Sequence, residues 1–271
     1  MVSLHIEPTS RCTLSCPLCS RTQILEQFGK KFLPIEDINI EHLDKFIEGT
    51  RFESILFCGT YGDAIMHPKL KQLVETCKKY TDCIQVATSG SGRNARWWNS
   101  FIDCLDDKDI VDFAIDGIPD NFTEYRVNAN WNQIEYAIKR TVQQGVYTRW
   151  IYIPFDYNKH TITKAEQLSK SLGINEFIVN ESDRLIPGTG KIIPQCKNQK
   201  LLYIGSNGQF MPCCNVHDYR FYYKSQWHKD KAKYDISKTT FKECARHFDE
   251  FYSTIHTQRP DYCVYTCGKC K

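Results

Sequence analysis

Three cysteines near the start of the chain, Cys12, Cys16 and Cys19, have the spacing CxxxCxxC. A short stretch of this kind can supply three of the four thiolates that hold a cubane iron–sulfur cluster. The fourth iron then has no protein ligand and is open to a small molecule. A zinc knuckle, or a disulfide with one spare thiol, is the competing interpretation. Structural zinc takes four ligands in closed pairs, and no fourth cysteine follows until Cys58, so the spacing favours the cluster.

The segments that must position these cysteines alternate between strand-like and helix-like patterns up to about residue 180. Apolar runs predict strands over residues 3–7, 54–58, 83–88, 110–116, 148–154 and 176–180. Amphipathic patterns predict helices over 40–48, 68–80, 95–105, 131–144 and 163–172. Successive βα units of this kind build a parallel sheet, so we expect an α/β fold, a partial (β/α)6 TIM-like barrel. Its active site would lie at the carboxyl ends of the strands.

The pattern changes after the turn at residues 187–190, where the sequence becomes rich in cysteine, aromatic residues and lysine. We therefore expect two domains, a barrel over residues 1–187 and a smaller cysteine-rich domain over 188–271. Asn207-Gly208 between two strand-like runs predicts a β-hairpin. That hairpin would bring Cys196 and Cys213 to the same end of a two-stranded ribbon, and a helix would follow over 241–255.

Composition limits the range of partners. The 271 residues include 35 Lys and Arg against 32 Asp and Glu, a net charge of +3, which requires no polyanionic partner. The 14 cysteines come without the features of a secretory signal peptide, which indicates a reducing compartment and predicts a cytoplasmic protein. No apolar run approaches the ~18 residues of a membrane span. We expect neither a membrane nor a nucleic-acid partner.

The cysteine triplet resembles the motif of the radical S-adenosylmethionine (SAM) enzymes. In that superfamily SAM chelates the open iron, and an electron from the cluster cleaves its sulfonium to give a 5′-deoxyadenosyl radical that abstracts hydrogen. The resemblance implies a 4Fe-4S cluster on Cys12, Cys16 and Cys19, with SAM as cosubstrate. Many members carry an aromatic residue before the third cysteine, near the adenine. Here that residue is Leu18, so we expect a contact without aromatic stacking.

Segments at the expected ends of the strands resemble SAM-binding segments of the same superfamily. In Gly59-Thr-Tyr-Gly-Asp63 the glycines let the backbone approach a ligand, and the Asp63 carboxylate can accept from the amino group of SAM. Thr88 and Ser89 stand where relatives have a Thr-Asn-Gly-like segment. The expected SAM contacts are Leu18, Gly59, Thr60, Tyr61, Gly62, Asp63, Thr88, Ser89, Asp116, Arg126 and Asn158.

Three of these expected contacts have specific roles or alternatives. Arg126 suits the SAM carboxylate, because the planar guanidinium can pair both oxygens. Asp116, in an Ile-Asp-Gly segment that resembles the same superfamily, would bind a ribose hydroxyl or stabilise a turn. Asn158 would reach the cofactor or substrate, or cap a loop.

The C-terminal cysteines resemble the opening of the SPASM and twitch domains, which carry auxiliary iron–sulfur clusters. Cys196, eleven residues and then a GxxxxC segment ending at Cys213 match that opening, and Cys263, Cys267 and Cys270 add three thiolates. Five candidates for four positions imply one auxiliary 4Fe-4S cluster, as in the shorter twitch form. A zinc ribbon built from Cys196, Cys213, Cys267 and Cys270 is the alternative.

The resemblance implies an enzyme that reductively cleaves SAM and abstracts hydrogen from a peptide or small-molecule substrate. The auxiliary cluster would transfer electrons or bind substrate, and an electron donor such as flavodoxin or ferredoxin would supply the electron. The alternative is a non-catalytic zinc or iron–sulfur interaction protein on a degenerate barrel.

Overall fold

The computed structural model describes residues 2–181, 192–198 and 201–268 of the chain. Its strands form one eight-stranded sheet with the order β6-β5-β4-β3-β2-β1-β7-β8. The strands are β1 (Val2–Ile6), β2 (Phe52–Phe57), β3 (Ile84–Thr88), β4 (Ile110–Ala114), β5 (Tyr147–Tyr152), β6 (Glu176–Val179), β7 (Leu201–Ile204) and β8 (Phe210–Met211). All neighbouring strands from β6 to β7 are parallel, and β8 returns antiparallel. The predicted partial barrel is confirmed.

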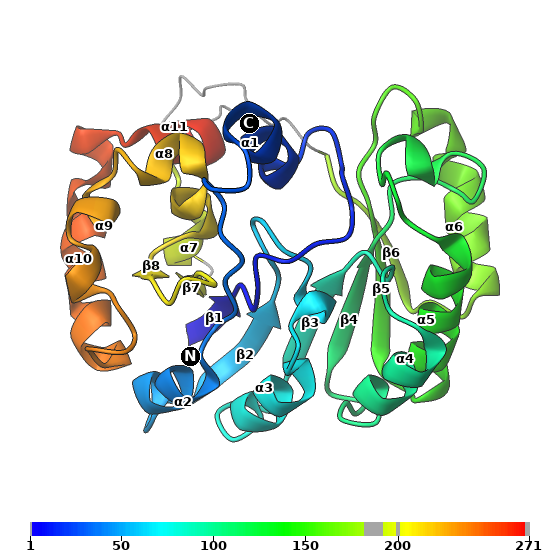
Figure 1. Ribbon diagram of the computed structural model, residues 1–271, viewed down its shortest axis with the longest axis horizontal. Coiled ribbons are helices and arrows are strands. Elements are labelled where there is room, and N and C mark those ends of the chain that lie inside the picture. Colours follow the sequence, from blue (N-terminus) through cyan, green and yellow to red (C-terminus); the bar gives the residue numbers. More distant parts are fainter. Residues whose placement is uncertain (1, 182–191, 199–200, 269–271) are drawn as a thin grey trace.

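Helices cover the outside of this sheet (Figure 1). The crossover helices are α2 (Ile40–Ile47), α3 (Leu70–Cys77), α4 (Ala95–Ile102), α5 (Trp131–Gln143) and α6 (Ile162–Ser171). Asparagine side chains cap the first turns of α2, α4 and α5 at Asn39, Asn94 and Asn130, where they satisfy free backbone N–H groups. Each of these helices buries one apolar face. The strands and crossover helices match the predicted segments to within a few residues.

The C-terminal hairpin continues the sheet of the barrel, a pairing that the sequence analysis did not anticipate. Strand β7 pairs in parallel with β1, with Ser3 opposite Leu201 and Ile6 opposite Ile204. The turn follows the Asn-Gly prediction, and Gly208 adopts a φ of 74° that favours glycine. Because β7 covers the edge of β1, the two halves of the chain share one sheet and one hydrophobic core.

The rest of the C-terminal half is helical. It contains α7 (Gln195–Asn198), α8 (Tyr219–Tyr222), α9 (Gln226–Lys229), α10 (Phe241–Gln258) and α11 (Asp261–Cys267). Helix α10 packs on the core through Phe241, whose ring lies 5.2 Å from that of Phe52 and 5.3 Å from that of Phe210. Trp227 on α9 is buried in the same core.

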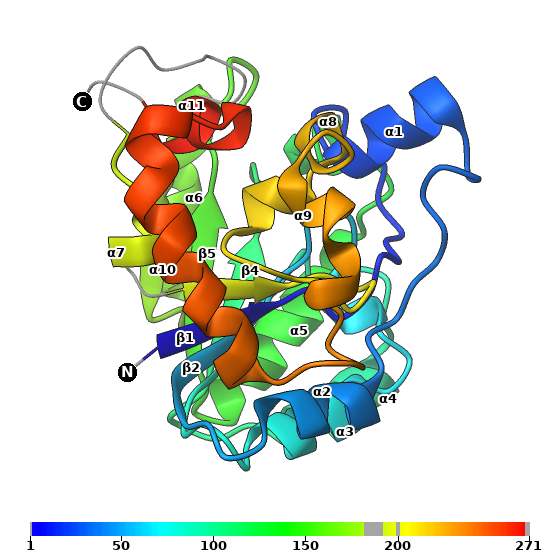
Figure 2. The same ribbon diagram turned by 90° about the vertical axis from the view of Figure 1, so that its left-hand side faces the viewer.

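Helix α1 (Ser20–Phe28) follows the cysteine loop and lies beside α8 in both views (Figures 1 and 2). Ser20 Oγ donates to Asp218 Oδ2 at 2.5 Å, and the ring of Phe28 meets that of Tyr219 at 6.0 Å. The two halves of the chain therefore also meet near the carboxyl ends of the strands. None of the helices formed by the described residues has both the length and the apolar character that a bilayer crossing requires.

Candidate functional site

The cysteine loop joins the carboxyl end of β1 to α1. Cys16 is buried with Leu14 and Tyr125, and Cys12 and Cys19 pack against this group. The backbone N–H of Leu14 donates to Cys12 Sγ at 3.4 Å, a bond that favours a thiolate. Burial, together with the charge of Asp63 and the neighbouring thiols, raises the pKa of Cys12 to about 12. The cysteines of this loop therefore become thiolates only where a positive charge, such as that of a bound metal, stabilises them.

Arg126 lies beside Cys16 of this loop. Its guanidinium Nε donates to Asp116 Oδ2 at 2.8 Å. Burial alone would lower the pKa of Arg126, but the charges of Asp116 and Cys16 raise it above its ordinary value. Burial raises the pKa of Cys16, whereas the charge of Arg126 opposes this rise. Arg126 thus lies between a fixed carboxylate and a cysteine sulfur, where it stabilises the charged form of that sulfur.

The glycine-rich segment lies against the chain that leads into the cysteine loop. A Cβ on Gly62 would collide with the backbone oxygen of Thr9, and one on Gly59 would collide with the oxygen of Gly62. Only glycine permits this close approach. The backbone N–H of Asp63 donates to Arg11 O at 2.9 Å, which fixes the segment to the residue before Cys12.

Asp63 joins two of the predicted SAM segments. Its Oδ2 accepts from the backbone N–H of Ser89 at 2.9 Å and from Ser89 Oγ at 2.6 Å, while Oδ1 accepts from Ile65 N at 3.3 Å. Thr88 Oγ1 accepts from Gly90 N at 3.0 Å. The structure therefore brings Asp63, Thr88 and Ser89 together at the ends of β2 and β3, as the sequence predicted.

Asp116 and Asn158 have their polar atoms engaged by the protein. Asp116 is fully buried, and its Oδ1 accepts from Ile153 N at 2.9 Å while Oδ2 accepts from Arg126. Asn158 is also fully buried, and it accepts from Phe155 N at 2.6 Å and donates to the carbonyls of Asp116 and Ile153 at 3.0 Å. These contacts favour the structural alternative for both residues.

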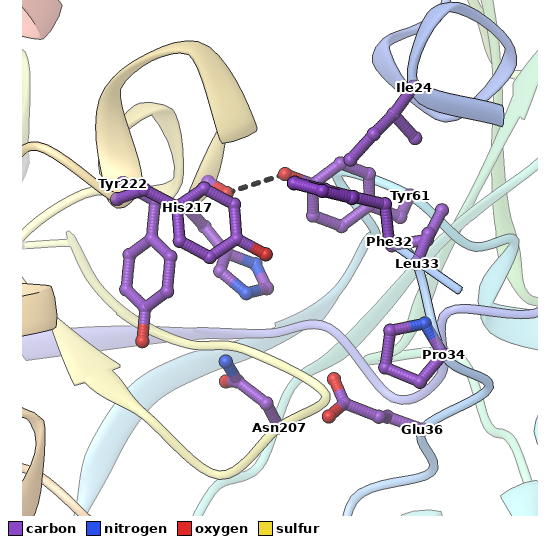
Figure 3. A pocket seen from close by; sticks show the side chains of 10 residues that line it. Ile24, Phe32, Leu33, Pro34, Glu36, Tyr61, Asn207, His217 and Tyr222 are labelled. Carbon is purple, nitrogen blue, oxygen red and sulfur yellow. Dashed lines mark hydrogen bonds between the residues drawn. The ribbon is translucent and has the colours of Figure 1, made fainter. Parts of the chain in front are cut away.

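Leu18, Thr60 and Tyr61 are the other side chains that the sequence predicted as SAM contacts. Leu18 is exposed on the cysteine loop, and Thr60 Oγ1 lies 3.3 Å from the hydroxyl of Tyr203. The side chain of Tyr61 donates its hydroxyl to His217 O at 2.7 Å and lines a cavity beside α1 (Figure 3). The backbone N–H of Tyr61 also has a partner in the protein, since it donates to Glu7 Oε1.

Beneath the glycine-rich segment lies a buried network that the sequence analysis missed. Glu7 Oε1 accepts from the backbone N–H groups of Tyr61 at 2.6 Å and Gly62 at 3.2 Å. Glu7 Oε2 accepts from the Tyr203 hydroxyl at 3.0 Å and lies 3.1 Å from His217 Nδ1. One carboxylate thus connects the predicted SAM loop to β7 and to the segment after β8. The only signal in the sequence was an acidic residue directly after a strand.

Four of the five predicted auxiliary ligands lie in one group. Cys196 and Cys213 are within hydrogen-bonding range of each other, and Cys263 interacts electrostatically with Cys196, Cys213 and Cys267. Cys270 lies outside the described residues. The pKa values of Cys196, Cys213 and Cys263 lie well above the ordinary value. The hydrogen bond with Cys213 and burial raise the pKa of Cys196, and burial and the charge of Cys213 raise that of Cys263. For Cys213, the interaction with Cys196 lowers the pKa, but Cys214 and burial raise it further. No disulfide joins the cysteines that the structure describes.

Both cysteine groups fit iron–sulfur clusters. The hydroxyl of Tyr252 is buried next to Cys196 and interacts with the Cys196 sulfur, so it can donate to a sulfur atom at this site. Cys213 Sγ accepts from Asn215 N and Nδ2, both at 3.4 Å. Over the described ranges, no three Cys, His, Asp or Glu side chains converge as ligands of a single metal ion. The thiolates of a cubane hold different irons and do not need to converge in this way.

A cavity of about 280 Å³ opens at Cys12. Three arginines line it, Arg11, Arg21 and Arg93, and Asp37 pairs with Arg11 at 2.9 Å. Arg93 donates to the carbonyl of Ile65 at 2.8 Å, so it is fixed in place. The surface over the cysteine loop therefore carries excess positive charge.

Comparison with known proteins gives similarity at the level of structure. No protein-family model and no curated protein matches the sequence. The crystal structure of Streptococcus suis SuiB bound to S-adenosylmethionine covers 99% of this chain and 72% of its own, with TM-score 0.61 and 12% identity. The structure of SuiB bound to the precursor peptide SuiA has a TM-score of 0.63 and 13% identity, and the match covers 99% of this chain and 71% of the SuiB chain. The structure of native anSMEcpe with bound AdoMet and the Cp18Cys peptide has a TM-score of 0.58 and 15% identity, and the match covers 89% of this chain and 79% of the anSMEcpe chain.

These similarities include the C-terminal half, since SuiB matches over nearly the whole length of the chain. They establish the fold. The chain has the radical SAM partial barrel, and its C-terminal part is consistent with the corresponding part of SuiB and anSMEcpe.

Proposed function

We propose that this chain, which has the fold of the radical SAM enzymes, reductively cleaves SAM and modifies a peptide or small-molecule substrate. The observation that carries this proposal is the loop of Cys12, Cys16 and Cys19 at the carboxyl end of β1, with Arg126 beside Cys16. A 4Fe-4S cluster bound there supplies the electron that cleaves SAM. Cys16 is buried, Arg126 stabilises a thiolate ligand, and Asp63, whose charge acts on Cys12, is a carboxylate that can accept from an ammonium.

Cys196, Cys213, Cys263 and Cys267 are the ligands that the structure favours for an auxiliary cluster, with Tyr252 as a donor to one of its sulfurs. Cys270 remains the fifth candidate. Ligation by four cysteines would favour electron transfer, and ligation by three would leave an iron open to substrate. On this proposal residues 1–187 form the SAM-binding barrel and residues 188–271 the auxiliary-cluster domain.

The test is anaerobic reconstitution followed by iron and sulfide counting and by a 5′-deoxyadenosine assay with dithionite. We expect about eight irons per chain, as two cubane clusters require, and formation of 5′-deoxyadenosine from SAM. Zinc without sulfide, and no cleavage of SAM, would instead support the alternative, a non-catalytic zinc or iron–sulfur binding protein.

A peptide substrate is supported by the similar structures, since SuiB was crystallised with the precursor peptide SuiA and anSMEcpe with the Cp18Cys peptide. A small molecule remains the other substrate class.

Hydrogen abstraction followed by loss of an electron would make the enzyme an oxidoreductase. A cytoplasmic location stays part of this proposal.

An acidic redox protein such as flavodoxin or ferredoxin suits the arginine-lined surface at Cys12. We expect Arg21→Gln to raise the concentration of flavodoxin needed for half-maximal activity by about threefold to tenfold, because one complementary charge is lost. Activity driven by dithionite should change much less. Lys139→Gln on the outer face of α5 is the control. An equal loss with both reductants would show that Arg21 does not contact the donor.

Arg126 offers a test of the thiolate environment. We expect Arg126→Met to reduce activity or cluster content by about 10- to 100-fold, since partners that hydrogen-bond to metal ligands have effects of this size. Arg126→Lys keeps the charge and should lose less. Arg140→Met removes an arginine that pairs with Asp103 on the outside of the barrel and is the control. The readouts are iron content and the electron paramagnetic resonance spectrum of the reduced cluster, and unchanged values would contradict this role.

A further inference from the structure

A second cavity lies on the other side of the connector between α1 and α2. It holds about 90 Å³ and separates connector residues 32–36 from residues 207–223 of the C-terminal half. The connector residues alternate between the two cavities, because Pro34 and Glu36 line this one while Ile35 lines the cavity at Cys12. A single extended segment thus separates this cavity from the cysteine loop.

Glu36 supplies a carboxylate to this cavity. Ser10 fixes its backbone from both sides, because Glu36 N donates to Ser10 Oγ and Ser10 N donates to Glu36 O, both at 2.9 Å. The side chain points into the cavity, towards Asn207 and His217 (Figure 3). Over the described ranges the carboxylate accepts no hydrogen bond and forms no ion pair. Burial raises the pKa of Glu36, the charge of His217 opposes this rise, and the nearby Glu7 adds to it.

Four of the ten residues that line the cavity are phenylalanine or tyrosine. Tyr223 meets Tyr222 at 5.4 Å and Phe32 at 5.9 Å between ring centroids, and Tyr61 closes the side towards the glycine-rich segment. Aromatic rings attract cations through the negative charge of their faces, most strongly where water is excluded. A carboxylate without a donor, surrounded by such rings, is complementary to a cation.

No cation of the described protein fills this role. None of the residues that line the cavity is a lysine or an arginine. His217 lies 3.1 Å from Glu7, and Arg220 on the adjacent helix pairs with Asp218 at 2.7 Å. The volume suits a compact ammonium with three donors better than a planar guanidinium with five.

We propose that this cavity binds a primary ammonium group of the substrate. That the ammonium belongs to a substrate rests on the proposed function. The site itself rests on Glu36, Asn207 and the aromatic residues of the wall. Tyr61 belongs both to this wall and to the predicted SAM loop, so a substrate anchored here begins directly beside that loop. A lysine side chain and a free peptide N-terminus are the two sources of such a group.

The experiment measures binding of three tripeptide amides by calorimetry to reconstituted protein with SAM and without reductant. Acetyl-Gly-Lys-Gly carries the ammonium on a side chain, Gly-norleucine-Gly carries it at the N-terminus, and acetyl-Gly-norleucine-Gly is neutral. We expect one cationic peptide to bind at least about tenfold more tightly than the neutral one, as a charge-assisted contact provides. The tighter of the two identifies the source. Equal binding of all three would overturn the site.

Variants connect the binding to Glu36. Glu36→Gln should abolish the preference for the cationic peptide, and Glu36→Lys should exclude it by placing an ammonium in the cavity. Glu26→Gln on the exposed face of α1 is the matched control and should keep the preference. A preference that survives in both Glu36 variants would also overturn the assignment.

The site and the proposed function can fail separately. Protein that forms 5′-deoxyadenosine but shows no preference for an ammonium overturns the site alone. Protein that binds the cationic peptide through Glu36, yet does not cleave SAM, overturns the proposed function and retains the site.

Discussion

Cys16→Ala is expected to abolish formation of 5′-deoxyadenosine from SAM. Cys16 is the most buried of the three loop cysteines and the one beside Arg126, so its loss removes one cluster ligand and leaves the arginine without its sulfur partner. A cluster held by two thiolates would be incomplete in this loop. The measurement is 5′-deoxyadenosine per chain after anaerobic reconstitution and reduction with dithionite, together with iron content.

Cys104→Ala is the matched control, because Cys104 follows α4, far from the cysteine loop in the fold, and its thiol donates to the carbonyl of Ser100. This variant should retain activity and the full iron content. If Cys16→Ala still cleaved SAM at the rate of the unmodified protein, the first cluster would have to be bound elsewhere, and the proposed function would be wrong.

Glu7→Ala is expected to destabilise the protein by about 3–5 kcal/mol, the usual cost of breaking a buried ion pair. The variant leaves His217, the Tyr203 hydroxyl and the N–H groups of Tyr61 and Gly62 without their acceptor. Urea unfolding at pH 7 measures the change. Glu26→Ala on the surface of α1 should stay within about 0.5 kcal/mol of the unmodified protein.

The same carboxylate predicts a dependence of stability on pH. Burial would raise the pKa of Glu7, but the ion pair with His217 and the hydrogen bonds from Tyr61 and Tyr203 lower it below its ordinary value. Since the folded state then binds fewer protons than the unfolded state, this contribution is complete above about pH 4.5 and is lost as the pH falls through the folded pKa. Unfolding measured from pH 7 down to below pH 4 should show a smaller loss of stability in Glu7→Ala. Parallel curves would contradict this assignment.

Local patterns in the sequence were sufficient to predict the strands, the crossover helices and the position of the cysteine loop. Strand alternation and helical periodicity depend on neighbouring residues, and parallel strands with crossover helices place their carboxyl ends at one edge. For this reason the sequence alone was sufficient to place the segments at Cys12, Asp63, Thr88 and Arg126 at the carboxyl ends of the strands.

Contacts between distant residues needed the tertiary structure. The pairing of β7 with β1 closes over almost 200 residues of intervening sequence, and no local pattern specifies the partner of an edge strand. The network of Glu7 with His217 depends on this pairing, because β7 and the hairpin carry His217 to the carboxyl end of β1. The sequence by itself determined which residues have metal-binding chemistry and on which loops they lie. The tertiary structure decided which charges are buried together, because burial and ion pairing depend on how distant segments pack.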